Sequence, residues 1–223
     1  MLVRTLPVLL LLLASSPAAK ADSSACRPAS GPGSQLLTVE ASTARTTHAS
    51  LRLWRREGRC WSPVAGPWRA RVGRNGLSGN RREGDGTTPT GTFAFGPTMY
   101  GIAPDPGVRY RYRRIVCGDY WVEDPRSPYY NTFRHVACGT PPPFKATGER
   151  LWQATTPYRH FAVLEFNMNP VVPGRGSGIF LHATTGGPTN GCVSLPLAQL
   201  RQVLRWLDPA ARPRISIRSA TSG

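Results

Sequence analysis

A histidine and a cysteine that share one turn-rich loop are the residues of this chain best suited to covalent chemistry. His182 follows the short apolar run Ile179–Leu181, and Cys192 ends the Gly-, Pro- and Thr-rich connection that comes next. An imidazole beside a thiol can accept its proton, and the ion pair that forms favours a thiolate at neutral pH. The spacing therefore predicts that Cys192 is a nucleophile and that His182 is its general base and acid.

The end of this loop offers further groups for acyl transfer. Thr189, Asn190 and Gly191 directly precede the cysteine, so their backbone N–H groups can point towards an oxyanion that forms beside the sulfur. A helix that starts just after Cys192, with Ser194 as its N-cap, would add a positive dipole end and lower the thiol pKa. These features together predict an acyl-transfer site.

Zinc is the main alternative chemistry for the same residues. A zinc site needs three or four ligands at short spacings. His182 and Cys192 have no C-x-x-C or H-x-x-x-H companion, and the remaining histidines are isolated at His48, His135 and His160. We therefore expect no metal site.

The N-terminal 21 residues predict export. Arg4 forms a minimal basic region, Leu6–Ala14 is an apolar run too short to span a bilayer, and Ala19-Lys20-Ala21 is a cleavage pattern. A lipoprotein signal that ends at Cys26 is the competing interpretation, but Ser-Ser-Ala is a poor lead-in to that cysteine. No other stretch approaches about 18 apolar residues, so no stable transmembrane anchor is expected. We expect an extracytoplasmic protein, either secreted or associated with the cell wall.

The five cysteines agree with export. They are Cys26, Cys60, Cys117, Cys138 and Cys192. In an oxidising compartment an odd number leaves one thiol over. Four cysteines can pair in three ways; pairing of neighbours, Cys26–Cys60 and Cys117–Cys138, is the simplest and leaves Cys192 free. The alternative, in which Cys192 is paired and another cysteine is free, stays open.

The charge is strongly positive and is almost all arginine. Without residues 1–21, which hold Arg4 and Lys20 but no acidic residue, the formal charge falls from +16 to about +14. Outside a cell the acidic partners are anionic wall polymers and lipid headgroups, although a solvated arginine-rich surface explains the charge equally well. The alternating segment Val108–Val116 carries arginines on one face, which we interpret as a solvated face and not as a nucleic-acid site. Nothing in the sequence indicates the oligomeric state.

Short alternating segments predict a mostly-β chain with one main α-helix after the cysteine. Residues 22–36 are a flexible lead-in, 37–218 form one domain and 219–223 are a tail. The expected strands start at Gln35–Val39, continuing in places to Thr47, and include Ala49–Trp54, Cys60–Val64, Trp68–Gly73, Thr92–Phe95, Val108–Val116, Phe161–Asn167, Ile179–Leu181 and Ile215–Ile217. Apolar residues from Leu197 to Leu207 share one helical face, so a helix is expected over Pro196–Leu207. Glu149–Trp152 is expected to form a short helical turn, and residues 117–145 an irregular excursion with Cys117 and Cys138 at its base.

The chain resembles the L,D-transpeptidases of bacterial cell-wall synthesis. The resemblance rests on Leu181-His182 followed by Thr189-Asn190-Gly191-Cys192-Val193, and on the upstream segment Thr88-Pro89-Thr90-Gly91-Thr92-Phe93. The stretch Asp119–Pro125 is similar to a branch of the family found in exported proteins. The resemblance runs from about Leu51 to Ile217. Two departures are a His-to-Cys loop shorter than in the best-known members and Ser194, where the family usually has arginine; Asn190 also stands where histidine is common.

This resemblance implies a β-sandwich-like catalytic domain that acts on peptidoglycan stem peptides without a cofactor. Cys192 would attack the carbonyl between the third residue and the D-Ala, and an amine would take the acyl group. His182 would be oriented by the backbone carbonyl of Ala183. Backbone N–H groups of Asn190, Gly191 and Cys192 would hold the oxyanion, and Thr189 would support the loop.

Two other functions stay open at this point. The same site could use water as the acyl acceptor, which would make the protein an L,D-carboxypeptidase or another wall peptidase. Alternatively the chain is a basic, disulfide-stapled envelope-binding protein without activity, in which Cys192 is structural.

Overall fold

The computed structural model describes residues 27–145 and 149–220, and its elements are mostly strands. The predicted signal peptide and Cys26 lie outside the described residues. In chain order the elements are β1 (Arg27–Pro28), β2 (Gln35–Ala41), β3 (His48–Glu57), β4 (Cys60–Arg71), β5 (Leu77–Ser78), β6 (Thr88–Pro89), β7 (Gly91–Gly101), β8 (Arg111–Arg114), β9 (Asp119–Trp121), β10 (Phe133–His135), β11 (Glu149–Arg150), the 3₁₀ turn η1 (Pro157–Arg159), β12 (Phe161–Leu164), β13 (Phe180–Ala183), β14 (Val193–Leu195), α1 (Leu197–Trp206), the 3₁₀ turn η2 (Pro209–Ala211) and β15 (Arg214–Ser219).

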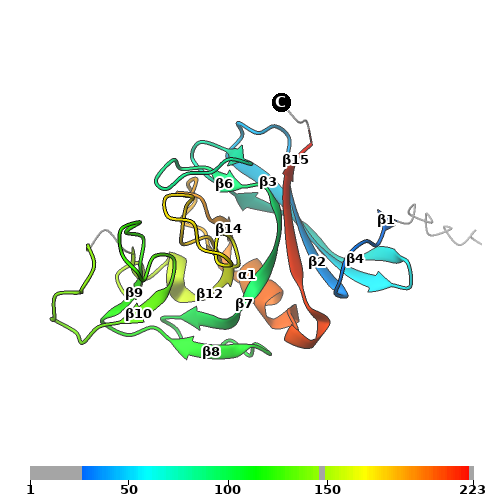
Figure 1. The fold of residues 1–223 in the computed structure, drawn as a ribbon. Coiled ribbons are helices and arrows are strands. Elements are labelled where there is room, and N and C mark those ends of the chain that lie inside the picture. The colour runs from blue at the N-terminus through cyan, green and yellow to red at the C-terminus, as the bar shows by residue number, and fades with distance from the viewer. Residues whose placement is uncertain (1–26, 146–148, 221–223) are drawn as a thin grey trace, which may run out of the picture.

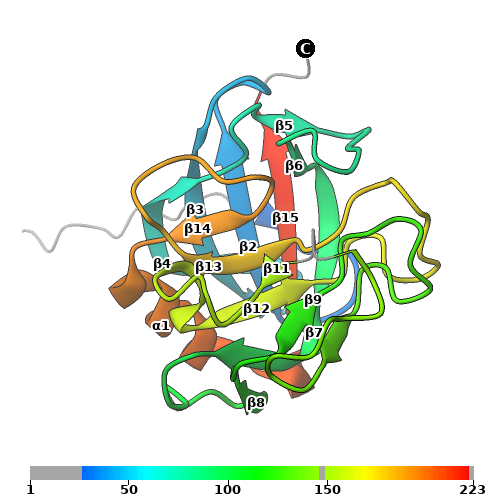
Figure 2. The ribbon, with the colours of Figure 1, turned by 90° about the vertical axis from the view of Figure 1, so that its left-hand side faces the viewer.

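The main sheet has ten strands and closes on itself. Its order is β1-β4-β14-β13-β12-β7-β15-β2-β3, with β8 added beside β7. Because β4 also pairs with β3, the strands form a ring around one core (Figure 1, Figure 2). The expectation of a mostly-β domain with one main helix after the cysteine is confirmed for the described residues.

Period-two alternation places the core. Leu37 and Val39 of β2, and Leu51 and Leu53 of β3, have no exposed surface, because alternate residues of a pleated strand share one face. The helix α1 adds Leu200, Val203 and Leu204 to this core and packs against β13 and β14. The strands β13 and β14 therefore bury one face in this core together with the helix, while Phe180 and Cys192 belong to a second cluster on the other face.

The chain after Cys192 differs from the prediction. Residues Val193–Leu195 form the strand β14, and the helix begins only at Leu197, with Pro196 at its N-cap position. Ser194 is not a helix cap, because it lies inside the strand and pairs with Arg71. Val193 and Leu195 each bury completely between neighbouring strands, and that burial outweighs the helical pattern that follows.

Three other segments also differ. Glu149–Arg150 forms a strand that pairs with β9, and not the expected helical turn. The first strand ends at Ala41 instead of continuing towards Thr47. The two strands expected over residues 60–73 join into one, β4, because its register shifts accommodate the prolines in its middle.

The excursion over residues 117–145 carries a small sheet of its own, in the order β10-β9-β11. It lies beside β12, away from β2 and β3 (Figure 1). The predicted disulfide between Cys117 and Cys138 is confirmed, and their Cα atoms are 5.4 Å apart. Cys60 is also disulfide-bonded, but its predicted partner lies outside the described residues, so that pairing stays a prediction. Among the described cysteines, Cys192 is the free one, and it is buried.

No described helix has both the length and the apolar character needed to cross a membrane.

Candidate active site

Cys192 and His182 line the same pocket, which has a volume of about 210 Å³. His182 lies on β13, and Cys192 immediately precedes β14, which runs parallel to β13. Each residue exposes 8% of its surface. The pocket is also lined by Glu149, Ala154, Pro157, Tyr158, Thr185, Gly187, Pro188, Thr189, Asn190 and Ser194.

The hydrogen bond made by His182 selects its tautomer. Its Nδ1 lies 2.8 Å from the carbonyl oxygen of Ala183. A carbonyl can only accept, so Nδ1 carries the hydrogen, and in the neutral ring Nε2 keeps its lone pair. Burial lowers the pKa of His182 to about 4, while the bond to Ala183 acts in the opposite direction. The imidazole is therefore neutral at pH 7 and able to accept a proton at Nε2.

The thiol of Cys192 is protonated in the free protein. Its Sγ donates to the carbonyl oxygen of Gly178 at 3.3 Å and accepts from the N–H of Phe180 at 3.4 Å. Burial raises the pKa of this thiol above its ordinary value, and the carboxylates of Glu149 and Glu123 raise it further. No helix start compensates, since β14 follows the cysteine. The resting state thus differs from the thiolate–imidazolium pair that the sequence suggested.

Thr189 fixes the loop that precedes the cysteine. Its hydroxyl donates to the carbonyl of Cys192 at 2.6 Å and accepts from the N–H of Gly191 at 3.1 Å. Thr189 also joins Gly73 in an isolated bridge, which ties the loop to the end of β4. The Gly191 N–H is therefore committed to Thr189 in this conformation, and the N–H groups of Asn190 and Cys192 remain as the expected oxyanion donors.

The upstream segment Thr88–Phe93 reaches the site through Thr88. The Thr88 hydroxyl accepts from the N–H of Gly73 at 2.8 Å and donates to the carbonyl of Cys192 at 3.3 Å. Thr88 has no exposed surface, so its buried hydroxyl links β6 to Gly73, just after β4, and to the backbone of the cysteine. This contact gives a physical role to a segment that turn chemistry alone describes only as a loop.

Arg81 is a site residue that sequence reasoning missed. It is 5% exposed, and its Nη1 lies 3.3 Å from the carbonyl oxygen of Asn190 and 3.3 Å from Asp85 Oδ1. Gly191 has a φ of +141°, and a Cβ at this position would collide with the Arg81 guanidinium. Arg81 thus explains why glycine precedes the nucleophile. No local pattern around residue 81 indicates this contact.

The excursion supports the site through Asn131. Its Oδ1 accepts from Trp121 Nε1 and from the N–H of Gly178, each at 3.0 Å. The Trp121 ring packs edge-on against Phe180, with ring centroids 5.1 Å apart. The carbonyl of Gly178 and the N–H of Phe180 are the two groups that hold the Cys192 sulfur, so the excursion fixes their positions.

Two buried carboxyl groups were also missed. Glu149 accepts a hydrogen bond from Tyr158, whose ring meets that of His182 edge-on at 5.9 Å. Burial raises the pKa of Glu123 to about 9, and repulsion by Glu149 and Glu83 acts in the same direction. Burial also raises the pKa of Glu149 to about 7, with the hydrogen bond from Tyr158 acting against it and repulsion by Glu83 adding to it. The sequence suggested a helical turn at Glu149, so no signal pointed to this carboxylate.

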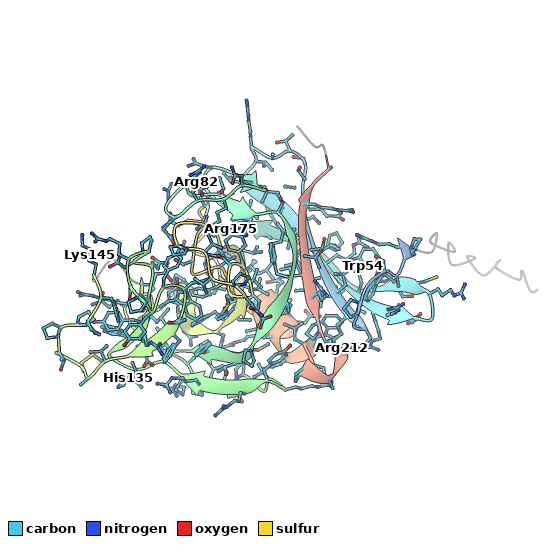
Figure 3. The ribbon with its side chains drawn as sticks, in the orientation of Figure 1. Trp54, Arg82, His135, Lys145, Arg175 and Arg212 are labelled. Atoms are coloured by element: carbon cyan, nitrogen blue, oxygen red, sulfur yellow. A yellow bond between two sulfur atoms is a disulfide. The ribbon has the colours of Figure 1, made fainter. Side chains whose placement is uncertain are left out.

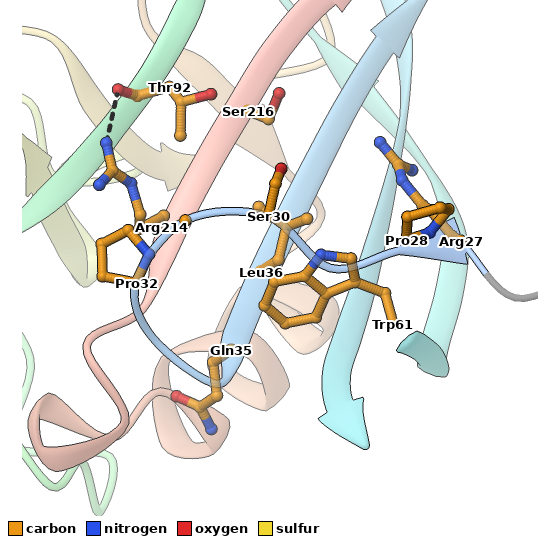
Figure 4. Close-up of a pocket in the computed structure, with 11 residues that line it drawn as sticks. Arg27, Pro28, Ser30, Pro32, Gln35, Leu36, Trp61, Thr92, Arg214 and Ser216 are labelled. Atoms are coloured by element: carbon orange, nitrogen blue, oxygen red, sulfur yellow. Dashed lines mark hydrogen bonds between the residues drawn. The ribbon is translucent and has the colours of Figure 1, made fainter. Parts of the chain in front are cut away.

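Another cavity, of about 330 Å³, lies between the segment after β1 and the strands β2 and β15 (Figure 4). It is lined by Arg27, Trp61 and Arg214 among others, but by no cysteine, histidine or carboxylate. Groups of three or more metal-binding side chains are not found among the described residues. Among the described residues, the free thiol of Cys192 shares its pocket with the imidazole of His182.

A family profile described as YkuD, the L,D-transpeptidase catalytic domain, matches residues 39–215. An L,D-transpeptidase (Yku) of known structure from Stackebrandtia nassauensis is 15% identical, with a TM-score of 0.33, over 89% of this chain and 61% of its own. The helical cell shape determining protein Pgp2 from Campylobacter jejuni is 14% identical, with a TM-score of 0.42, over 86% of this chain and 49% of its own. This chain thus spans about half to three-fifths of the length of these two proteins. No curated protein matches it.

The family match covers most of the chain, from β2 to β15, and includes both His182 and Cys192. The chain therefore belongs to the L,D-transpeptidase catalytic-domain family, whose members act on peptidoglycan.

Proposed function

We propose that the protein is an exported L,D-transpeptidase that forms a thioester on Cys192 and transfers peptidoglycan stem peptides to an amine. The observation that carries this proposal is the pocket shared by a protonated thiol and a neutral imidazole whose Nε2 is free to act as a base. The family match supports the substrate class.

In the first half-reaction, the thiol proton moves to His182 Nε2 as Sγ leaves Gly178 and attacks the carbonyl before D-Ala. Both partners are neutral and buried, so the proton transfer takes place as the C–S bond forms and does not precede it. The developing oxyanion accepts hydrogen bonds from the N–H groups of Asn190 and Cys192. His182 then gives its proton to the amine of D-Ala, which leaves, and the thioester remains.

In the second half-reaction, the amine of an acceptor attacks the thioester carbonyl. His182 Nε2 takes a proton from the attacking nitrogen and returns it to the departing Cys192 sulfur. A new amide bond forms, the C–S bond breaks and the neutral pair is restored.

The test is mass spectrometry of the purified mature protein after incubation with a tetrapeptide stem. We expect a mass increase of one acyl tripeptide on Cys192 in the wild type and none in Cys192→Ala, which should remain folded. In His182→Gln the adduct should form at least about a hundredfold more slowly, the usual loss of a general base. A folded wild type that stays unmodified by every stem peptide would overturn the proposal.

The products distinguish the acceptor. Cross-linked dimers indicate transpeptidation, whereas a trimmed tripeptide without dimers indicates hydrolysis by an L,D-carboxypeptidase. A non-catalytic role for Cys192 predicts instead that no adduct forms and that Cys192→Ala unfolds the protein.

A further inference from the structure

A carboxylate and a phenol that the proposed mechanism does not use lie in the same pocket as the catalytic pair. Glu149 comes from β11 and Tyr158 from η1, and both line the pocket with His182 and Cys192. The Tyr158 hydroxyl donates to Glu149 Oε2. The Tyr158 ring also packs against His182 and Phe180, so it holds the carboxylate in a fixed place beside the nucleophile.

Burial raises the pKa of Glu149 to about 7, and when the group is ionised no cation lines the pocket to balance its charge. Glu149 is the only carboxylate among the residues that line the pocket, and no lysine or arginine lines it. Among the described residues, Glu149 accepts one hydrogen bond, which Tyr158 donates to Oε2, and no described residue donates to Oε1. The nearby Arg81 already bonds Asp85, Thr87 and Asn190.

A fixed carboxylate without a cation, at the wall of a concave site, is suited to an ammonium group. Such pairs form charge-assisted hydrogen bonds, which are about twice as strong as neutral ones. An ammonium would also offset the repulsion by which Glu149 raises the pKa of the Cys192 thiol. Binding of the right substrate would then ease deprotonation of the nucleophile, while an anionic group would be repelled.

We propose that Glu149, held by Tyr158, is the subsite that binds a primary ammonium group of the stem peptide beside Cys192. The inference rests on the proposed function and adds the chemical class that the pocket selects. Two amines qualify as the source: the side-chain amine of the donor's third residue, and the amine of the acceptor.

The first experiment measures acyl-enzyme formation by two tetrapeptide donors that differ only in lysine or norleucine at the third position. We expect the wild type to prefer the lysine donor by about tenfold in kcat/KM, and Glu149→Gln to lose that preference. Glu149→Asp should keep part of it, and Tyr158→Phe should weaken it. Glu165→Gln, which changes an exposed carboxylate outside the pocket, is the matched control and should behave as wild type.

A second arm assigns the source of the amine. The thioester is preformed with the norleucine donor and then exposed to an amine acceptor or to water. If Glu149→Gln slows aminolysis but not hydrolysis, while acylation is unchanged, the bound ammonium belongs to the acceptor. If neither half-reaction distinguishes Glu149→Gln from wild type, the inference is overturned, whereas a wild type that reacts with no donor overturns the proposed function instead.

A third arm needs no turnover. Butylammonium should increase the rate at which iodoacetamide alkylates Cys192 in the wild type, because it offsets the charge of Glu149. Butanol should leave this rate unchanged, and the rate in Glu149→Gln should respond to neither compound. An equal response of wild type and Glu149→Gln to butylammonium would overturn the subsite.

Discussion

At the scale of single residues, the site stores its nucleophile in an unreactive form. The buried thiol is held by Gly178 and Phe180, and the buried imidazole is held by Ala183. Neither is charged in the absence of substrate, because burial disfavours both ions. The proton of Cys192 can therefore move to His182 only once a substrate is bound beside them.

This resting state predicts slow, base-promoted labelling of the cysteine. Because the pKa of Cys192 is raised above its ordinary value of 9.0, the iodoacetamide alkylation rate should still be rising with pH at pH 9. Mass spectrometry over pH 6–9.5 measures the rate. Replacing the neighbouring carboxylate in Glu149→Gln should increase the rate at a given pH. A plateau below pH 8 would show that the thiolate already exists in the free protein.

The sequence predicted the reactive pair but not its surroundings. His182 and Cys192 stand out because residue type and loop composition are local properties. Arg81 and Tyr158 contact the site from segments far away in the chain, so no local pattern reveals them. Glu149 was assigned to a helical turn because a short polar segment does not show that a strand lies beside it.

At the scale of elements, the cysteine is held by strands that precede it by about a hundred residues. Thr88 connects β6 to Gly73 and to the Cys192 carbonyl, with no exposed surface. Thr88→Val keeps the shape but leaves the Gly73 N–H buried without an acceptor. We expect a loss of about 2 kcal/mol in unfolding free energy and slower acylation.

Thr88→Ser keeps the hydroxyl and is the matched control. Denaturant titration measures the stability of both variants, and mass spectrometry measures acylation. Equal stability of Thr88→Val and Thr88→Ser would contradict the role given to this hydroxyl.

The disulfide at the base of the excursion makes a second prediction at this scale. Cys117→Ser/Cys138→Ser opens a loop of 21 residues, which should cost about 3 kcal/mol by the chain-entropy account. Because the same excursion holds Gly178 through Asn131, acylation should also fall. Cys192→Ser removes no cross-link, so its denaturation midpoint should stay near that of the wild type. A double variant as stable as Cys192→Ser would show that the excursion orders itself without the bridge.

Elements were predicted where periodicity is strong. The helix α1 follows from the spacing of Leu197 to Leu204, and the predicted bounds Pro196 and Leu207 each lie one residue outside it. The strand β14 was missed because three buried residues are too short a segment to show a period. The closure of the ring by β4 depends on pairing between distant strands, which no single segment encodes.

At the scale of the whole molecule, buried titratable groups set the pH range of stability. Burial lowers the pKa of His182, and likewise that of His160, from 6.5 to about 4. Between these values the unfolded chain binds more protons than the folded one, so stability is lost as pH falls from 6.5 towards 4. Glu123 and Glu149, whose pKa values are raised, act oppositely and lose stability as pH rises above 4.5.

We therefore expect unfolding free energy to be greatest at mildly acidic to neutral pH. His160→Gln should reduce the loss between pH 6.5 and 4, and Glu123→Gln should reduce the loss on the alkaline side. Urea titrations across pH 4–9 measure both limbs. Variants whose pH profiles run parallel to the wild type would contradict the assignment of these groups.

The positive charge is spread over the molecule. The exposed residues Arg82, Lys145, Arg175 and Arg212 lie in four separate loops (Figure 3). Association with anionic wall polymers, which stays a prediction, would then be non-directional and would weaken as salt increases.

The strand pairing that closes the ring is shortest between β14 and β4, directly after the nucleophile. β14 meets β4 through the single pair Ser194–Arg71, whereas β3 and β4 pair along most of their length. The loop before Cys192 closes the same edge, because the N–H of Thr189 donates to the carbonyl of Val72 at 2.9 Å and the N–H of Arg74 donates to the carbonyl of Thr189 at 2.7 Å. The loop that carries the nucleophile therefore also closes the ring where its strand pairing is shortest.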